Sequence, residues 1–260
     1  MKKSVVLPLQ DEHGLCPFEP GSLDEDLKTI SECGYDGVEL GITDPDTVSV
    51  NAVKEKLKHE ALELSALTTG QAYGIEGISI TERDPGKREM AKVRIKSHID
   101  FASNFEATPV IIGSLRGVGD SPQATRWLVE NLSEVAEYAE TMDVEIAFEP
   151  LNRYESQIVN SVETALEIVE EVGSPKVGLL FDTFHANIEE PNISESIRKG
   201  AEQIIYVHLA DSNRWAPGYG HLDFPAVFSV LKEVGYEGFC SLESLPKPNK
   251  KECLNAPFEI

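Results

Sequence analysis

Short β-branched runs alternate with longer helical patterns along almost the whole chain, and this alternation constrains the fold more than any other feature. Strands that alternate with helices indicate βαβ units, in which the strands are parallel and the crossovers right-handed. Strands are predicted at residues 4–9, 37–40, 62–68, 109–113, 145–149, 177–182, 204–208 and 239–243. Helices are predicted at residues 23–33, 50–60, 86–105, 124–142, 161–172, 193–200 and 224–234.

Such a pattern fits either a closed barrel or an open doubly wound sheet. An open sheet predicts a glycine-rich phosphate loop after its first strand. Here the first strand leads into the sequence QDEH at residues 10–13, without a GxGxxG motif. A length of 260 residues also matches the ~250 typical of an α/β barrel. We therefore predict a single (β/α)8 TIM barrel domain that spans residues 1–260.

The eighth helix of this barrel is missing from the pattern. After Glu243 the chain continues as SLPKPN and ends in a short tail that proline residues interrupt. Proline disfavours a helix because it lacks an amide hydrogen. We interpret this as a lost helix or a truncated sequence. A partner chain would then cover the exposed flank, which suggests a homo-oligomer.

Composition and charge exclude several classes of function. With 23 basic and 45 acidic residues the net charge is −22, which argues against a nucleic-acid partner, because phosphates require clustered cations. No run approaches the ~18 apolar residues of a membrane helix, and the apolar run near the N-terminus is too short for a signal peptide. The four cysteines form no CxxC pair and are expected to be reduced thiols. A cytoplasmic protein is predicted.

Four potential metal ligands end the last four predicted strands: Glu149, Asp182, His208 and Glu243. Each follows an apolar run, where a charged group is costly unless it is paired or coordinated. The carboxyl ends of barrel strands carry the chemistry of such folds. Three carboxylates and one histidine make an oxygen-rich site that suits Mn²⁺ or Mg²⁺, with Co²⁺ tolerated, better than structural zinc. Salt-bridged carboxylates are the alternative, but clustered like charges require a cation.

Three segments around these residues resemble the ketose 3-epimerases, which include D-tagatose and D-allulose 3-epimerases on a xylose isomerase-like barrel. They are FEPLNRYE at 148–155, LFDTFHANIEE at 180–190 and VHLADSNR at 207–214. The segments DSNRWAPG at 211–218 and TGQAY at 69–73 look closest to the 5-keto-L-gluconate epimerase branch. The resemblance covers nearly the whole chain as far as about residue 246. The missing eighth helix departs from the family's pattern.

The resemblance implies a function and a set of roles. It implies that Glu149 and Glu243 bind one divalent metal, Mn²⁺ by preference, and act as acid and base on opposite faces of a ketose. One glutamate would remove the C3 proton and the other would return a proton from the other side. It also implies that His185, Arg214 and Glu155 contact the sugar substrate.

Other functions remain open at this point. An aldose–ketose isomerase of the same superfamily, such as a hydroxypyruvate isomerase, could use the same metal and glutamates. An endonuclease of abasic DNA would need a multinuclear zinc site and a basic groove, which six histidines and the acidic charge do not favour. A non-catalytic sugar-binding protein is disfavoured because both glutamates are present.

Overall fold

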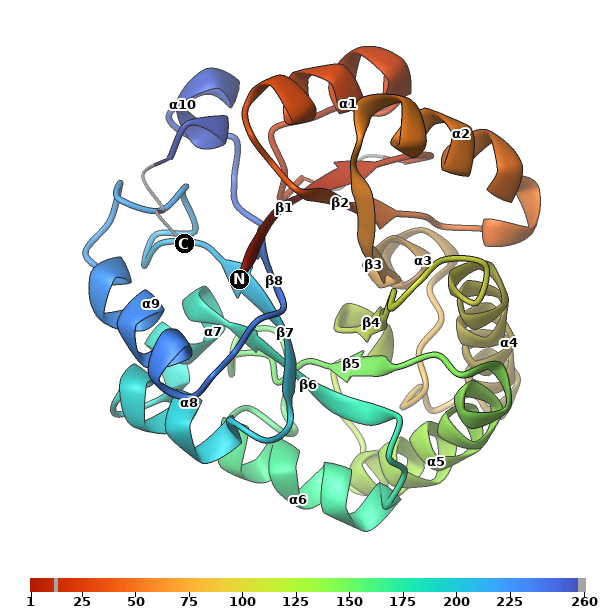
Figure 1. Ribbon diagram of the computed structural model, residues 1–260. Helices are drawn as coiled ribbons and strands as arrows, with labels where there is room; N and C mark the ends of the chain where they lie inside the picture. Colours follow the sequence, from red (N-terminus) through yellow and green to blue (C-terminus); the bar gives the residue numbers. More distant parts are fainter. Residues whose placement is uncertain (12–13, 257–260) are drawn as a thin grey trace.

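The computed structural model describes residues 1–11 and 14–256 and contains a closed parallel barrel. Strands β1 to β8 follow each other around the barrel in chain order, and β1 closes it by pairing with both β2 and β8. The helices lie outside the ring of strands (Figure 1). The predicted (β/α)8 architecture is confirmed.

The strands are β1 (Lys2–Pro8), β2 (Gly37–Gly41), β3 (Glu63–Thr68), β4 (Val110–Ile112), β5 (Ile146–Phe148), β6 (Val177–Asp182), β7 (Ile204–Leu209) and β8 (Phe239–Leu242). The helices are α1 (Leu23–Glu32), α2 (Val50–Glu60), α3 (Gly70–Glu76), α4 (Pro85–Ala102), α5 (Ala124–Met142), α6 (Val162–Val172), α7 (Thr183–Glu189), α8 (Ile193–Gly200), α9 (Phe224–Glu233) and α10 (Lys250–Leu254). Two 3₁₀ turns are η1 (Pro45–Thr47) and η2 (Ser114–Arg116).

Local sequence signals account for most of these boundaries. Helix α6 begins with a capping box, in which the Ser161 hydroxyl accepts a hydrogen bond from the amide of Thr164. It ends at Gly173, which adopts the left-handed conformation that stops helices. Helices α3 and α7 were not predicted, because seven residues are too few to establish a helical period.

The end of the chain corrects one prediction. A short helix, α10, follows β8 where the sequence pattern indicated that the eighth helix was missing. Its Lys250 forms an ion pair with Asp26 of α1, and the carbonyl of Leu254 accepts a hydrogen bond from Tyr35. Asn249 caps this helix, which explains how a single turn can form after a proline-containing segment. Helix α10 therefore covers part of the flank next to α1.

Two buried apolar clusters fill the fold. The larger one lies between the strands and the surrounding helices. The smaller one takes one residue from each of five successive strands, as expected for side chains that point into the barrel; its members are Ala66, Ile111, Ala147, Leu180 and Tyr206. Among the described residues, no helix has the length and apolar character needed to span a membrane.

Candidate active site

The four predicted metal ligands converge at the carboxyl ends of adjacent strands. Asp182 ends β6, His208 lies in β7, and Glu149 and Glu243 directly follow β5 and β8. One ligand atom from each residue lies within 4.8 Å of those of the other three, and all four side chains are buried. The barrel thus brings together residues that lie up to 94 positions apart in the chain.

Unsatisfied polar atoms in this cluster indicate that it suits a cation. Glu149 Oε1, Asp182 Oδ2 and His208 Nδ1 are buried and have no hydrogen-bond partner among the described residues. The His208 Nδ1 atom lies 3.7 Å from Glu149 Oε1, 3.8 Å from Asp182 Oδ2 and 3.5 Å from Glu243 Oε2. Buried polar atoms without a hydrogen-bond partner are unfavourable, and a divalent cation would coordinate all of them.

The backbone around Asp182 fixes the direction of its carboxylate. Oδ1 accepts hydrogen bonds from the amides of Phe184 and His185 and so caps helix α7. Oδ2 is the oxygen that remains directed toward the cluster. One carboxylate therefore both starts a helix and offers a ligand atom.

His208 is held by a residue that the sequence analysis did not single out. Its Nε2 lies 2.9 Å from Oε2 of Glu39, which is fully buried in β2. In the neutral ring, an Nε2–H donated to Glu39 leaves the Nδ1 lone pair for a cation at the cluster. Although burial alone would lower the pKa of His208, the carboxylates of Glu39, Glu243 and Glu149 raise it well above its usual value, so a cation that binds Nδ1 has to displace a proton. The only sequence signal for Glu39 was a charge inside an otherwise apolar strand.

Replacing Glu39 with leucine is expected to lower Mn²⁺ affinity about 10- to 100-fold, because His208 then loses the acceptor that fixes its ring. Glu39→Gln should lose less, because the amide oxygen can still accept the Nε2–H bond. Isothermal titration of metal-stripped protein with Mn²⁺ measures both effects. Glu63→Gln is the control, since Glu63 pairs with Lys2 on the surface. Wild-type affinity in Glu39→Leu would show that the contact does not orient His208.

The carboxylate of Glu149 occupies the space beside Gly113 that a side chain at position 113 would fill. A Cβ atom built on Gly113 would lie 2.2 Å from Glu149 Oε2, closer than any real contact. Burial raises the pKa of the Glu149 carboxyl above its usual range, although the nearby His185 and His208 counteract this shift. A cation bound at the cluster would oppose the effect of burial and favour the charged carboxylate of Glu149.

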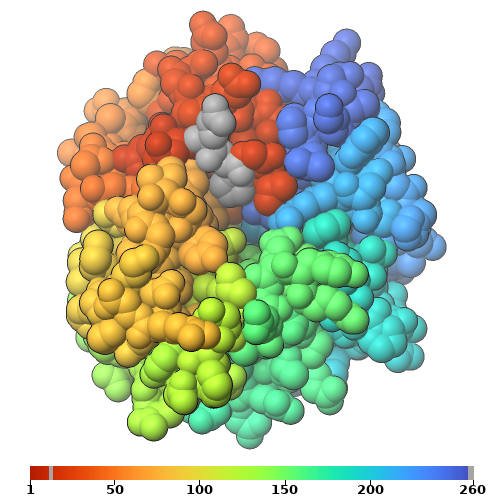
Figure 2. Space-filling view, turned by 180° about the vertical axis from the view of Figure 1, so that it is seen from behind, coloured from red at the N-terminus to blue at the C-terminus, as the bar shows by residue number. Residues whose placement is uncertain are grey.

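A cavity of about 230 Å³ opens next to the cluster. The loops after the strands surround it, and Figure 2 shows the orange α3 region beside the green segments that follow β4 and β5. Glu149, Glu243, His185, Arg214 and Glu155 all line this cavity. The structure thus brings every predicted substrate-contact residue to one space.

The three predicted substrate-contact residues form one connected network. Arg214 Nη1 donates to Glu155 Oε1 at 2.7 Å, and Nη2 lies 3.7 Å from Glu243 Oε2. The side-chain amide of Asn152 donates to Glu155 and to Nδ1 of His185. Because Nδ1 accepts, the His185 proton lies on Nε2, which is 3.8 Å from Glu149 Oε1. Asn152 lies within the FEPLNRYE segment, but no role was predicted for it from the sequence.

Asp211 is a loop residue for which no role was predicted from the sequence, and it holds Arg214 in place. Its buried carboxylate accepts hydrogen bonds from the amides of Ser212, Gly218 and Leu222. Its carbonyl accepts the amide hydrogen of Arg214, which adopts a left-handed φ of 61°. Burial disfavours a charged guanidinium, but Glu243, Asp182, Glu155 and Glu149 raise the pKa of Arg214, so it remains a cation.

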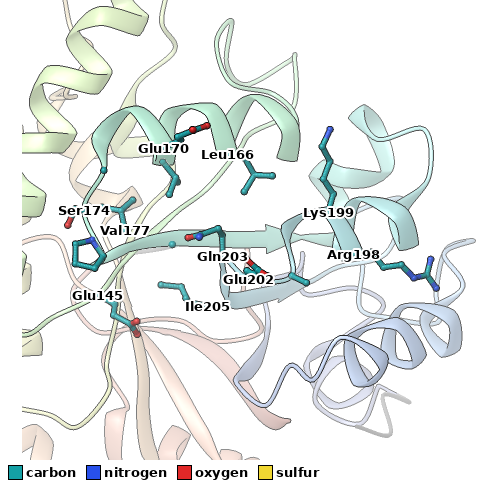
Figure 3. Close-up of a pocket in the computed structure, with 15 residues that line it drawn as sticks. Glu145, Leu166, Glu170, Ser174, Val177, Arg198, Lys199, Glu202, Gln203 and Ile205 are labelled. Atoms are coloured by element: carbon teal, nitrogen blue, oxygen red, sulfur yellow. The ribbon is translucent and has the colours of Figure 1, made fainter.

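A second, larger cavity of about 920 Å³ lies at the other end of the barrel. Its lining includes Val177 at the start of β6 and Gln203 just before β7, as Figure 3 shows. The cations at its edge already form ion pairs, Arg198 with Glu233 and Lys199 with Glu163. Since barrel chemistry belongs to the carboxyl ends of strands, this cavity is not the candidate site.

Fold and site together define a (β/α)8-barrel enzyme with a buried centre of three carboxylates and one histidine beside a small polar cavity. A family model described as xylose isomerase-like TIM barrel matches residues 27–254, and this chain belongs to that family.

Several relatives of the chain are named as sugar epimerases. An L-ribulose 3-epimerase from Mesorhizobium japonicum is 30% identical over 256 residues, which cover 92% of this chain and 80% of that protein. A D-psicose 3-epimerase from Enterocloster bolteae is 40% identical over 125 residues, which cover 48% of this chain and 40% of that protein. The crystal structure of a D-allulose 3-epimerase from Methylomonas sp. matches with a TM-score of 0.79 and 25% identity over 94% of this chain and 84% of that chain. The predicted resemblance to ketose 3-epimerases is confirmed.

Proposed function

We propose that this enzyme inverts C3 of a free ketose or keto-sugar acid through an enediolate, with Glu149 and Glu243 as the acid/base pair. One observation carries the proposal. Of the four clustered residues, the two glutamates also line the cavity, whereas Asp182 and His208 are not among its described lining residues. Both glutamates can therefore contact a substrate in the cavity, whereas Asp182 and His208 would only bind the cation.

Two carboxylates suit this reaction better than one. A proton next to a carbonyl is acidic, and a base within hydrogen-bond reach can remove it. Inversion requires that the proton return to the opposite face, which needs a second group there. A divalent cation held by Glu149, Asp182, His208 and Glu243 would polarise the carbonyl and stabilise the enediolate. The donor set of one nitrogen and three carboxylates supports Mn²⁺ as this cation.

The neighbouring network supports the same assignment. His185 can direct its Nε2–H into the cavity because Asn152 occupies Nδ1. Arg214 places a permanent positive charge beside Glu243, where negative charge would develop on the substrate oxygens. Glu155 holds the guanidinium in that position and lines the cavity itself.

Metal-dependent deuterium exchange tests this function. Metal-stripped protein, with and without Mn²⁺, is incubated in D₂O with 5-keto-L-gluconate, D-tagatose, D-allulose and L-ribulose, and the sugars are followed by NMR. We expect deuterium at C3 and conversion to the C3 epimer only when Mn²⁺ is present. Exchange at C1 or C2 would instead assign an aldose–ketose isomerase of the same family. A lack of exchange with every sugar would contradict the proposed chemistry.

A cytoplasmic location and a homo-oligomeric state stay predictions.

A further inference from the structure

Arg116 is a fully buried cation that the reaction does not use directly. It ends η2, the turn after β4, and is the largest side chain in the fully buried core. No carboxylate among the described residues forms an ion pair with it, and burial lowers the pKa of its guanidinium to about 9. The negative charge of Glu149 counteracts this shift only in part, so the hydrogen bonds of Arg116 must offset the remaining cost of burial.

Those contacts all go to the end of β5 and the loop that follows it. Nη1 donates to the carbonyl of Glu149 at 2.8 Å. Nη2 donates to the hydroxyl of Ser156 at 2.8 Å, to the carbonyl of Val159 at 3.0 Å and to that of Ile158. The guanidinium also lies over the ring of Phe148, 5.4 Å from its centroid. A planar fork that bridges four acceptors is a contact that lysine cannot reproduce.

The loop that Arg116 holds is strained at one of the contacted residues. Val159 has a φ of 50°, a left-handed conformation that is rare for a β-branched side chain. Such a conformation persists only where the surroundings enforce it, and the Arg116 bond to the Val159 carbonyl does so. The loop is also joined to the loop after β4 by the amide of Gln157, which donates to the carbonyl of Val118 at 2.8 Å.

This loop carries the network beside the cavity. Arg116 donates hydrogen bonds to the Glu149 carbonyl at one end of this loop and to the Ile158 and Val159 carbonyls at the other end. In the sequence, Asn152 and Glu155 lie between these two contacts. They in turn hold His185 and Arg214. We propose that Arg116 is a positioning residue, which fixes the Glu149 carboxylate and the Glu155 network in their working geometry. The inference rests on the proposed function.

Two substitutions separate positioning from simple stability. Arg116→Met removes the fork and the charge, whereas Arg116→Lys keeps a charge but not the fork. In variants that circular dichroism shows to be folded, we expect kcat for the ketose that the wild type epimerises to fall about 10²-fold with little change in KM. Mn²⁺ affinity, measured by the electron paramagnetic resonance of free Mn²⁺, should fall about 10-fold because Glu149 shifts. The control is Arg83→Met, since Arg83 bonds exposed Asp120 in the loop after β4.

The outcomes are distinct. Folded Arg116→Met or Arg116→Lys with wild-type kcat and Mn²⁺ affinity, even at a lower melting temperature, would overturn the inference and leave Arg116 a purely structural residue. If both variants fail to fold, Ser156→Ala decides, because it removes one acceptor of the fork; a reduced kcat supports positioning, and a wild-type kcat overturns it. Wild-type protein that binds Mn²⁺ but exchanges no ketose contradicts the proposed function alone. The Mn²⁺ comparison then still tests whether Arg116 positions Glu149.

Discussion

Replacing Glu243 with glutamine is expected to lower epimerisation about 10³-fold, because glutamine cannot exchange a proton with C3 at neutral pH. Its amide oxygen can still contribute a ligand atom, so the protein should stay folded and retain part of its Mn²⁺ affinity. Residual deuterium exchange at C3 should be confined to the epimer whose proton faces Glu149. NMR in D₂O, started separately from each of two C3 epimers, measures both the conversion and the exchange.

The exchange pattern distinguishes two bases from one. Equal loss of exchange from both epimers would indicate that Glu243 acts on both faces or only through the metal. Full activity in Glu243→Gln would contradict any acid/base role. Glu237→Gln is the matched control, because Glu237 is exposed and precedes β8 at the opposite end of the barrel.

Replacing Gly113 with alanine is expected to lower kcat/KM by about 10²-fold or more while leaving the fold intact. The new Cβ would meet the end of the Glu149 side chain, so this carboxylate must leave the cluster. The backbone at Gly113 has a φ of −97° and a ψ of −107°, outside the main regions that alanine favours, so the substitution is expected to lower the melting temperature as well. The loss of Mn²⁺ affinity in protein that is still folded at the assay temperature reports the displaced Glu149 carboxylate separately from this loss of stability.

A matched alanine substitution controls for the added methyl group. At exposed Gly86, where α4 begins, a Cβ would come no closer than 3.2 Å to Asp84, so Gly86→Ala should keep wild-type kcat/KM. If Gly113→Ala keeps both kcat/KM and Mn²⁺ affinity, Glu149 does not need the position that the structure gives it.

The candidate ligands could be predicted because they obey a local rule. Glu149, Asp182, His208 and Glu243 each follow or end a short apolar run, and a parallel barrel carries the ends of its strands to one face. Strand β6 and helices α2, α5 and α8 have the predicted bounds, because their periodicity and end signals lie within the segment itself. Helix α10 could not be predicted, since its packing against α1 involves residues more than 200 positions away.

The amino-acid sequence by itself determined the order of strands and helices, the barrel that this order implies, and the residues that end its strands. Only the tertiary structure decided which side chains hold these strand-end residues in position. Glu39 meets His208 across 169 positions, and Arg116 meets Glu149 across 33. Periodicity reports which face of a segment is buried, but it carries no information about the partner on that face. The partners are set by the register and closure of the barrel, which exist only once all eight strands have paired.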